Sequence, residues 1–416
     1  MQKDRTEVRF KIFQFKKVKL FFILIVTTFG LTIKSTAQKY GLYSNDSLLL
    51  QSNYLQETIK LNLHFPETYN FSADSTHYPI TIIFDSQNEQ TYSHILNSFD
   101  LLTNETQIPE TIIIGIPFNF ENRLYLTSNH KKENDSLSGI ERMELFLFSE
   151  LIPKLQKEHK ANHFISIIGH SRTGYLVNYL SFKRAKEINI AISLSGFYSE
   201  PPLSITKFSN FLLDSTNFPN RFSYYCSVGN TLEESTYLEE YQKLLVKTSP
   251  SKLPKNLKMQ GRENQYSNHI TNYWLSVPPI LIDAFSEYNS ILDNWFYNRL
   301  KKEKMKNPVE LFKKDLEIAS EKIGMELKPS LTHIFSLASH FGYQNKEYKI
   351  AFEFLDLGLR YYPSYLEFYQ EIIEYHRKLN QQEKVNYYKQ ILCDKTLSNQ
   401  FISEFKRNEL LEYLDE

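Results

Sequence analysis

Short apolar runs and longer amphipathic stretches alternate along the chain between about residues 40 and 300. Most of the short runs are rich in β-branched residues, which is typical of strands buried on both faces of a parallel sheet. These runs cover 80–84, 111–116, 164–168, 188–194 and 222–228. The stretches with helical spacing cover 92–102, 139–159, 175–186 and 271–288. Strands that alternate with helices predict an α/β fold with a mostly parallel sheet and helices on both faces.

Two further segments complete the predicted sheet. Residues 57–65 alternate strictly between polar and apolar side chains, which indicates a half-buried antiparallel strand at one side of the sheet. A short run at 257–259 comes before a polar loop and the last helix of this part of the chain. Catalytic groups in such sheets belong at the carboxyl ends of the strands.

The pattern changes after about residue 300, where no strand-like run follows the charged segment 301–306. Two Pro-Ser pairs, at 329–330 and 363–364, stand 34 residues apart with two helical patterns between them. This period resembles tetratricopeptide repeats, and the alternative is an irregular helical appendage. We therefore expect an α/β domain over 38–300 and a helical region over 301–416 that binds a protein partner or packs on the first domain.

The first 37 residues have the composition of a secretory signal peptide. A basic lead from Lys3 to Lys19 is followed by an apolar run at 20–31, which is short for a membrane span, and by small residues that end at Ala37. We expect cleavage after Ala37 and a secreted or periplasmic protein without a membrane segment; the alternative is an uncleaved anchor. Export permits a disulfide between Cys226 and Cys393, but nothing in the sequence demands one.

Charge and composition narrow the range of partners. The chain of 416 residues carries 48 basic and 48 acidic side chains, so its formal net charge is zero. No global basic field favours nucleic acid or an anionic membrane surface. His, Cys and Asp residues nowhere have metal-ligand spacing, so we expect neither a metal nor a cofactor.

The stretch I-S-I-I-G-H-S-R-T-G at 165–174 places Ser171 between a predicted buried strand and a predicted helix. A serine on such a sharp turn is the arrangement of a nucleophile elbow, in which the turn exposes Oγ beside the first amides of the helix. The usual motif is G-x-S-x-G, and here Thr173 occupies the last position while glycine follows at Gly174.

A serine nucleophile requires a base and an acid, which follow it in the order acid and then histidine in enzymes with this elbow. His269 is the only histidine between Ser171 and the helical region. The acid should follow the strand at 222–228, where we favour Glu233 and keep Glu234 as the alternative. We expect His170 to project away from the site as a packing residue.

Two oxyanion donors should face the developing negative charge. One is the backbone N–H of Arg172, directly after the nucleophile. The other should come from the loop after the strand at 80–84, with Ser86 or Gln87 as the donor.

Several segments in this order resemble the putative esterase family of α/β-hydrolases, which includes esterase D-like and ferric-siderophore esterase-like enzymes. The segments are Y-P-I-T-I-I-F-D at 78–85, I-I-I-G-I-P at 112–117 with Arg123, the helix at 138–153, G-H-S-R-T-G at 169–174 and the S-V-G strand end at 227–229. The resemblance covers about 51–300 and implies an α/β-hydrolase fold and a serine esterase with the triad Ser171, Glu233 and His269. Thr173 and Ser86 depart from the family pattern, which commonly has glycine at both positions.

We therefore expect a carboxylic-ester hydrolase that forms an acyl-enzyme on Ser171 and acts on a small-molecule ester. Two alternatives remain: a binding protein that keeps the hydrolase fold, and an acyltransferase that uses the same triad. The sequence does not identify the ester, because loops set the specificity of such sites.

Overall fold

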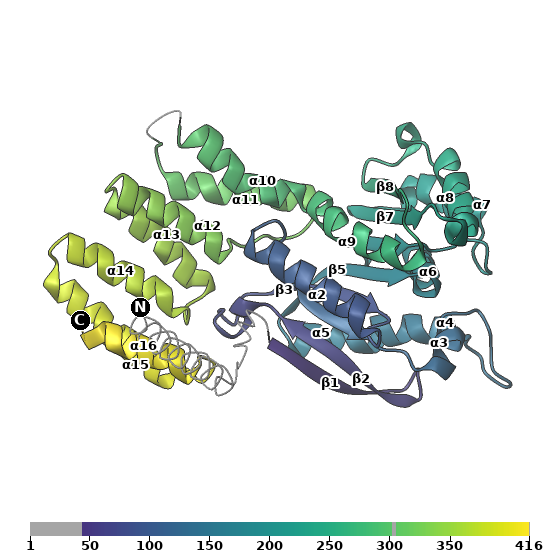
Figure 1. The fold of residues 1–416 in the computed structure, drawn as a ribbon, viewed down its shortest axis with the longest axis horizontal. Helices are drawn as coiled ribbons and strands as arrows, with labels where there is room; N and C mark the ends of the chain where they lie inside the picture. Colours follow the sequence, from purple (N-terminus) through teal and green to yellow (C-terminus); the bar gives the residue numbers. More distant parts are fainter. Residues whose placement is uncertain (1–43, 302–304, 416) are drawn as a thin grey trace, which may run out of the picture. The chain divides into compact units, whose positions relative to one another are not determined.

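A computed structural model describes residues 44–301 and 305–415 of the chain. The predicted signal peptide, residues 1–37, lies outside the described residues. The core of the described part of the chain is an eight-stranded sheet in the order β1-β2-β4-β3-β5-β6-β7-β8 (Figure 1). The strands are β1 (Ser44–Ser52), β2 (Glu57–Phe65), β3 (Tyr78–Phe84), β4 (Ile112–Ile116), β5 (Ala161–His170), β6 (Ile190–Leu194), β7 (Phe222–Gly229) and β8 (Leu257–Asn264).

The sheet is parallel from β4 to β8, whereas β1 and β2 pair antiparallel at one side. The predicted α/β fold is therefore confirmed, including the antiparallel strand at 57–65. The central strand β3 is buried at every position, because helices cover both of its faces and no residue is left for solvent.

Helices follow most of the strands and pack on the two faces of the sheet (Figure 1). They are α2 (Glu89–Asn104), α3 (Phe120–Leu126), α4 (Gly139–Leu145), α5 (Ile152–Glu158), α6 (Arg172–Arg184), α7 (Ile205–Leu213), α8 (Ser235–Lys247) and α9 (His269–Ala284). Alternate residues of β3 enter different cores: Ile82 packs with side chains of α4 to α8, and Ile83 packs with those of α2 and α9. The single helix predicted at 139–159 contains a π-helical turn, Phe146–Leu151, between α4 and α5.

Beyond β8, every regular element among the described residues is a helix. Besides α9 and two π-helical turns, Trp295–Arg299 and His340–Gln344, these are α10 (Ser286–Asn294), α11 (Pro308–Ile323), α12 (Leu331–Ser339), α13 (Tyr348–Tyr361), α14 (Leu366–Lys378), α15 (Gln382–Ser398) and α16 (Glu404–Asp415). Two glycines allow close helix packing, because a Cβ at Gly342 would lie 2.5 Å from the Tyr375 ring and one at Gly358 would lie 2.7 Å from the Phe368 ring. Their likeness to tetratricopeptide repeats stays a prediction.

The helical region shares a core with the sheet. The buried cluster beneath α2 and α9 continues without a break through Trp295 and Phe312 to Ile334 and Phe354. The described residues, 44–301 and 305–415, form one compact unit. Within the described residues, no helix combines the length and apolar character that crossing a membrane requires.

A buried ion pair joins the helical region to the sheet. Lys328, between α11 and α12, lies with its Nζ 2.5 Å from Oε2 of Glu110, just before β4, and 3.6 Å from the centre of the Tyr78 ring. Thr68 donates a further hydrogen bond of 2.6 Å to the same carboxylate oxygen. Burial lowers the pKa of Lys328 to about 8, although Glu110 opposes that shift. Removing one partner would leave the other charge buried without compensation.

We expect Glu110→Gln to lower the free energy of unfolding by about 3 kcal/mol, because Lys328 would lose its counter-charge. Glu310→Gln is the matched control, since Glu310 pairs with Lys313 on the surface, where it is 69% exposed. That variant should change stability by about 0.5 kcal/mol or less. Urea unfolding of both variants tests the prediction, and equal stabilities would contradict it.

Candidate active site

Ser171 lies on the turn between β5 and α6, as the sequence predicts. Its backbone has φ of 57° and ψ of −117°, a left-handed conformation that non-glycine residues rarely adopt. Its N–H donates to the carbonyl of Leu194 in the neighbouring strand β6 at 2.8 Å. The glycines around it are required by close approach, because a Cβ at Gly169 would lie 2.2 Å from a backbone oxygen and one at Gly174 would lie 2.8 Å from Gly196 Cα. This geometry is that of a nucleophile elbow.

Glu234 is the carboxylate that meets the predicted base. Its side chain is fully buried, and Oε1 accepts a hydrogen bond from Nδ1 of His269. Oε2 accepts two more, from Ser195 Oγ at 2.6 Å and from the Gly229 N–H at 2.9 Å. Burial raises the pKa of Glu234, but these hydrogen bonds and the imidazole outweigh it and hold the pKa below its usual value. Glu234 is therefore ionised and fixed in place.

Glu233, which the sequence favours as the acid, does not meet His269 in the structure. Glu233 is exposed, and no hydrogen bond joins it to His269 among the described residues. Both glutamates belong to the 3₁₀ turn Leu232–Glu234, in which successive side chains point about 120° apart, so only one of them can face inward. The alternative, Glu234, takes the inward position.

His269 begins helix α9, where Asn268 caps the helix by accepting from the Thr271 N–H at 2.9 Å. Its ring lies between Tyr237, with ring centres 4.8 Å apart, and His170, with ring centres 4.4 Å apart. Because Nδ1 donates to Glu234, Nε2 carries the lone pair that a general base needs. In the described chain no hydrogen bond yet joins Nε2 to Ser171 Oγ, a contact that often forms only when substrate binds.

His170 does not project away from the site, contrary to the expectation from sequence. Its Nε2–H donates to the backbone carbonyl of His269 at 2.8 Å, and its ring meets the edge of Tyr273. Burial, and to a smaller extent the neighbouring His269, lowers the pKa of His170 to about 4. A neutral His170 therefore supports the segment that carries the base.

The predicted donor Arg172 lies at the first position of α6, where backbone N–H groups have no acceptor within the helix. Its guanidinium is fully engaged, because Nη2 donates to Glu200 Oε1 at 2.7 Å and to the Thr127 carbonyl at 2.9 Å, while Nη1 also contacts Glu200. The side chain thus fixes the start of α6 and leaves the backbone N–H for an oxyanion.

Ser86 cannot be the second backbone donor, which corrects the prediction. Its N–H donates to the carbonyl of Ile116 at 3.2 Å, which adds one hydrogen bond between the ends of β3 and β4. Its buried hydroxyl accepts from Asn62 Nδ2 at 3.1 Å. Gln87 is the alternative second donor. Within the described part of the chain, its backbone N–H has no hydrogen-bond acceptor.

Sequence reasoning missed the residues that hold the acid. Ser195 and Gly229 stand at the carboxyl ends of β6 and β7, and Ser195 has a positive φ of 42°. The sequence shows that a serine and a glycine follow two predicted parallel strands, which is a signal for a site at that edge of the sheet. It does not show that both residues would donate hydrogen bonds to the carboxylate of Glu234.

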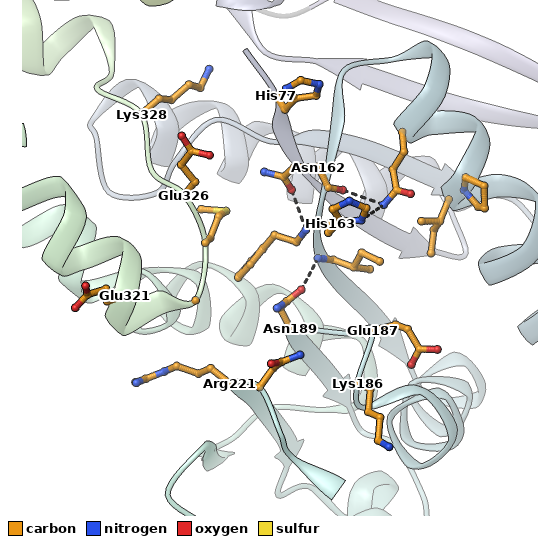
Figure 2. A pocket seen from close by; sticks show the side chains of 18 of the residues that line it. His77, Asn162, His163, Lys186, Glu187, Asn189, Arg221, Glu321, Glu326 and Lys328 are labelled. Atoms are coloured by element: carbon orange, nitrogen blue, oxygen red, sulfur yellow. Dashed lines mark hydrogen bonds between the residues drawn. The ribbon is translucent and has the colours of Figure 1, made fainter. Parts of the chain in front are cut away.

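A cavity of about 1090 Å³ lies elsewhere, at the amino ends of the strands. Figure 2 shows His77, His163, Asn189 and Arg221 around it, from the starts of β3, β5, β6 and β7, and the helical-region side chains Glu326 and Lys328 opposite them. None of the residues proposed for catalysis lines this cavity. Because ligands of open α/β sheets bind at the carboxyl ends of the strands, we place the candidate site at Ser171.

Over the described ranges, 44–301 and 305–415, no group of three or more His, Cys, Asp or Glu side chains is arranged to hold a metal ion. The polar side chains around Ser171 instead form hydrogen bonds with one another.

The model of the family described as Putative esterase matches residues 52–274. Among solved structures, an IroE-like serine hydrolase from Shewanella oneidensis is similar at 18% identity and a TM-score of 0.58, over 75% of this chain and 98% of that one. An uncharacterised protein from Capnocytophaga ochracea is similar at 16% identity and a TM-score of 0.56, over 89% and 99%. These likenesses show the fold, and the second extends into the helical region. No curated protein matches the sequence.

The low pKa of His170 predicts a pH-dependent stability. Unfolding restores an ordinary pKa of about 6.5, so between pH 6.5 and 4 the unfolded chain binds a proton that the folded chain does not, and stability falls as the pH falls. Between pH 6.5 and 4, we expect the free energy of unfolding of His170→Gln to fall by about 3 kcal/mol less than that of the unaltered protein. Urea unfolding at several pH values measures it. His77→Gln, at an exposed ring, is the control, and parallel pH curves for all three proteins would refute the prediction.

Proposed function

The chain belongs to the putative esterase family, and from this premise we propose that it is a serine hydrolase that cleaves carboxylic esters through an acyl-enzyme on Ser171. The observation that carries the proposal is the pairing of His269 with the buried carboxylate of Glu234. This pair lies beside the turn that carries Ser171, because the rings of His269 and His170 have centres 4.4 Å apart. Ser171, Glu234 and His269 come after β5, β7 and β8, so all three lie at the carboxyl ends of parallel strands.

The chemistry follows from these positions. Nε2 of His269 takes the proton of Ser171 as Oγ attacks the ester carbonyl, and Glu234 stabilises the imidazolium that forms. The N–H groups of Arg172 and Gln87 receive the negative charge of the tetrahedral intermediate. The imidazolium then protonates the leaving alcohol, and a water molecule activated by the same histidine releases the acid and restores Ser171.

We further propose that the protein is exported, on the strength of the sequence of its first 37 residues, and that its substrate is a small-molecule ester. A protein partner for the helical region stays a prediction. The family match covers 52–274, so it gives no support for such a partner.

Hydrolysis of short-chain nitrophenyl esters tests the proposal. We expect measurable turnover in the unaltered protein and a loss of about 10⁴-fold or more in kcat for Ser171→Ala and for His269→Ala, because each removes a member of a unit that acts together. A fluorophosphonate should label the unaltered protein at Ser171. Absence of both turnover and labelling would favour the alternative of a binding protein with the hydrolase fold.

Variants at the two adjacent glutamates test which of them is the acid of the triad. Glu234→Gln should lower kcat by about 10⁴-fold, because an amide cannot stabilise the imidazolium or hold its tautomer. Glu233→Gln should keep kcat within about twofold of the unaltered protein, since that side chain is exposed. Steady-state kinetics on the same ester decide the matter, and equal losses in both variants would show that the assignment is wrong.

A further inference from the structure

Thr173 occupies the elbow position where the family motif has glycine, and the structure gives its hydroxyl a definite role. The residue is fully buried. Its Oγ1 accepts the N–H of His170 at 3.0 Å, which closes the turn around Ser171. The hydroxyl proton then has two acceptors in reach, Asp85 Oδ2 at 2.9 Å and the His170 carbonyl at 3.0 Å. A carboxylate is the stronger acceptor, so the proton belongs to Asp85.

Asp85 is the centre of a network at the end of β3. Besides Thr173, it accepts from Arg123 through Nε at 2.6 Å and Nη2 at 2.7 Å, a two-pronged pair. The backbone of Asp85 has a positive φ of 63°, which is uncommon for a residue with a side chain. Such a conformation persists where the surroundings determine it, and here four hydrogen bonds to one carboxylate do so, the fourth coming from Gln87.

The same network fixes Gln87. Its Nε2 donates to Asp85 Oδ1 at 2.9 Å, and its Oε1 accepts the N–H of Phe118 at 2.9 Å. The N–H of Asn88 closes a turn onto the Asp85 carbonyl at 3.0 Å. The loop 85–88 is thus held on both sides of the Gln87 peptide. The direction of the Gln87 N–H therefore depends on where Asp85 is anchored.

We propose that Thr173 and Asp85 form a positioning pair that fixes the position of the Gln87 N–H relative to the turn that carries Ser171. The hydroxyl of Thr173 links two segments that must keep a fixed spacing: the turn that carries Ser171 and the loop that carries the second oxyanion donor. A glycine at 173 could not make this link. The inference rests on the proposed esterase function and adds positioning residues to it, without making either of them a catalytic residue.

The consequence is a defect in turnover when the link is removed. Displacement of a catalytic donor by a fraction of an ångström costs rate, because the donor is aimed at the oxyanion and not at the ester carbonyl of the bound substrate. Substrate binding should change little. The expected signature is therefore a fall in kcat at a nearly constant KM.

The test compares Thr173→Val, which keeps the shape but loses the hydroxyl, with Thr173→Ser, which keeps the hydroxyl. We expect kcat on a nitrophenyl ester to fall by about 10- to 100-fold in the valine variant, with KM within about twofold, and to recover to within about threefold in the serine variant. The rate of labelling by a fluorophosphonate should follow kcat. A valine variant with unchanged kcat, or a serine variant as slow as the valine one, would overturn the proposal.

Ser181→Ala is the matched control for a purely structural effect. Ser181 is also fully buried and lies in the same helix, α6, where its hydroxyl donates to the Val177 carbonyl at 2.7 Å. The Ser181→Ala variant should have a lower free energy of unfolding in urea but an unchanged kcat. If both variants lost kcat only in proportion to their unfolded fraction, the hydroxyl of Thr173 would have no positioning role.

A double-mutant cycle with Asp85→Asn separates action through the network from any other effect. If the hydroxyl acts through Asp85, adding Thr173→Val to Asp85→Asn should cost less than about threefold further in kcat. Independent, multiplying losses would overturn the pairing. An unaltered protein without turnover or labelling would refute the esterase function and this inference together, whereas an active protein indifferent to Thr173→Val would refute the inference alone.

Discussion

The rest of the site depends on the hydrogen bonds that hold the buried carboxylate of Glu234. A charge with no exposed surface is stable only where hydrogen bonds replace its water, and three groups do so here: His269, Ser195 and the Gly229 N–H. These groups come from the ends of separate strands and from the start of α9. Satisfying one carboxylate therefore fixes the relative positions of β6, β7 and the segment that carries His269.

The same principle recurs at the other end of the site with Asp85. Four hydrogen bonds to that carboxylate come from α6, α3 and its own loop. The turn that carries Ser171 thus lies between two anchored carboxylates, one that is hydrogen-bonded to His269 and one that is hydrogen-bonded to Thr173 and Gln87. Each carboxylate has a different main partner, which is the imidazole of His269 for Glu234 and the guanidinium of Arg123 for Asp85.

Local patterns in the sequence predicted the parts of this arrangement that are themselves local. The apolar and alternating runs predicted strands β2 to β8 but not β1, and the position of Ser171 between a strand and a helix predicted the elbow. His269 followed from being the only histidine in its interval. Failures arose where a residue's direction decides its role. In the 3₁₀ turn Leu232–Glu234, the side chain of Glu234 points inward and that of Glu233 points to solvent. The N–H of Ser86 is hydrogen-bonded to the Ile116 carbonyl and so is not available as a donor. A hydrogen bond to the His269 carbonyl holds the ring of His170 beside the site.

The core shared by the sheet and the helical region has a consequence for how the chain can be divided. A cut near residue 300 would strip the cover from Trp295, which is fully buried and meets Phe312 and Phe354 edge-on. It would also leave Glu110 without Lys328. The residues before about 300 are therefore not a separable unit: a fragment that ended there would expose the apolar faces of its last helices and would be prone to aggregation.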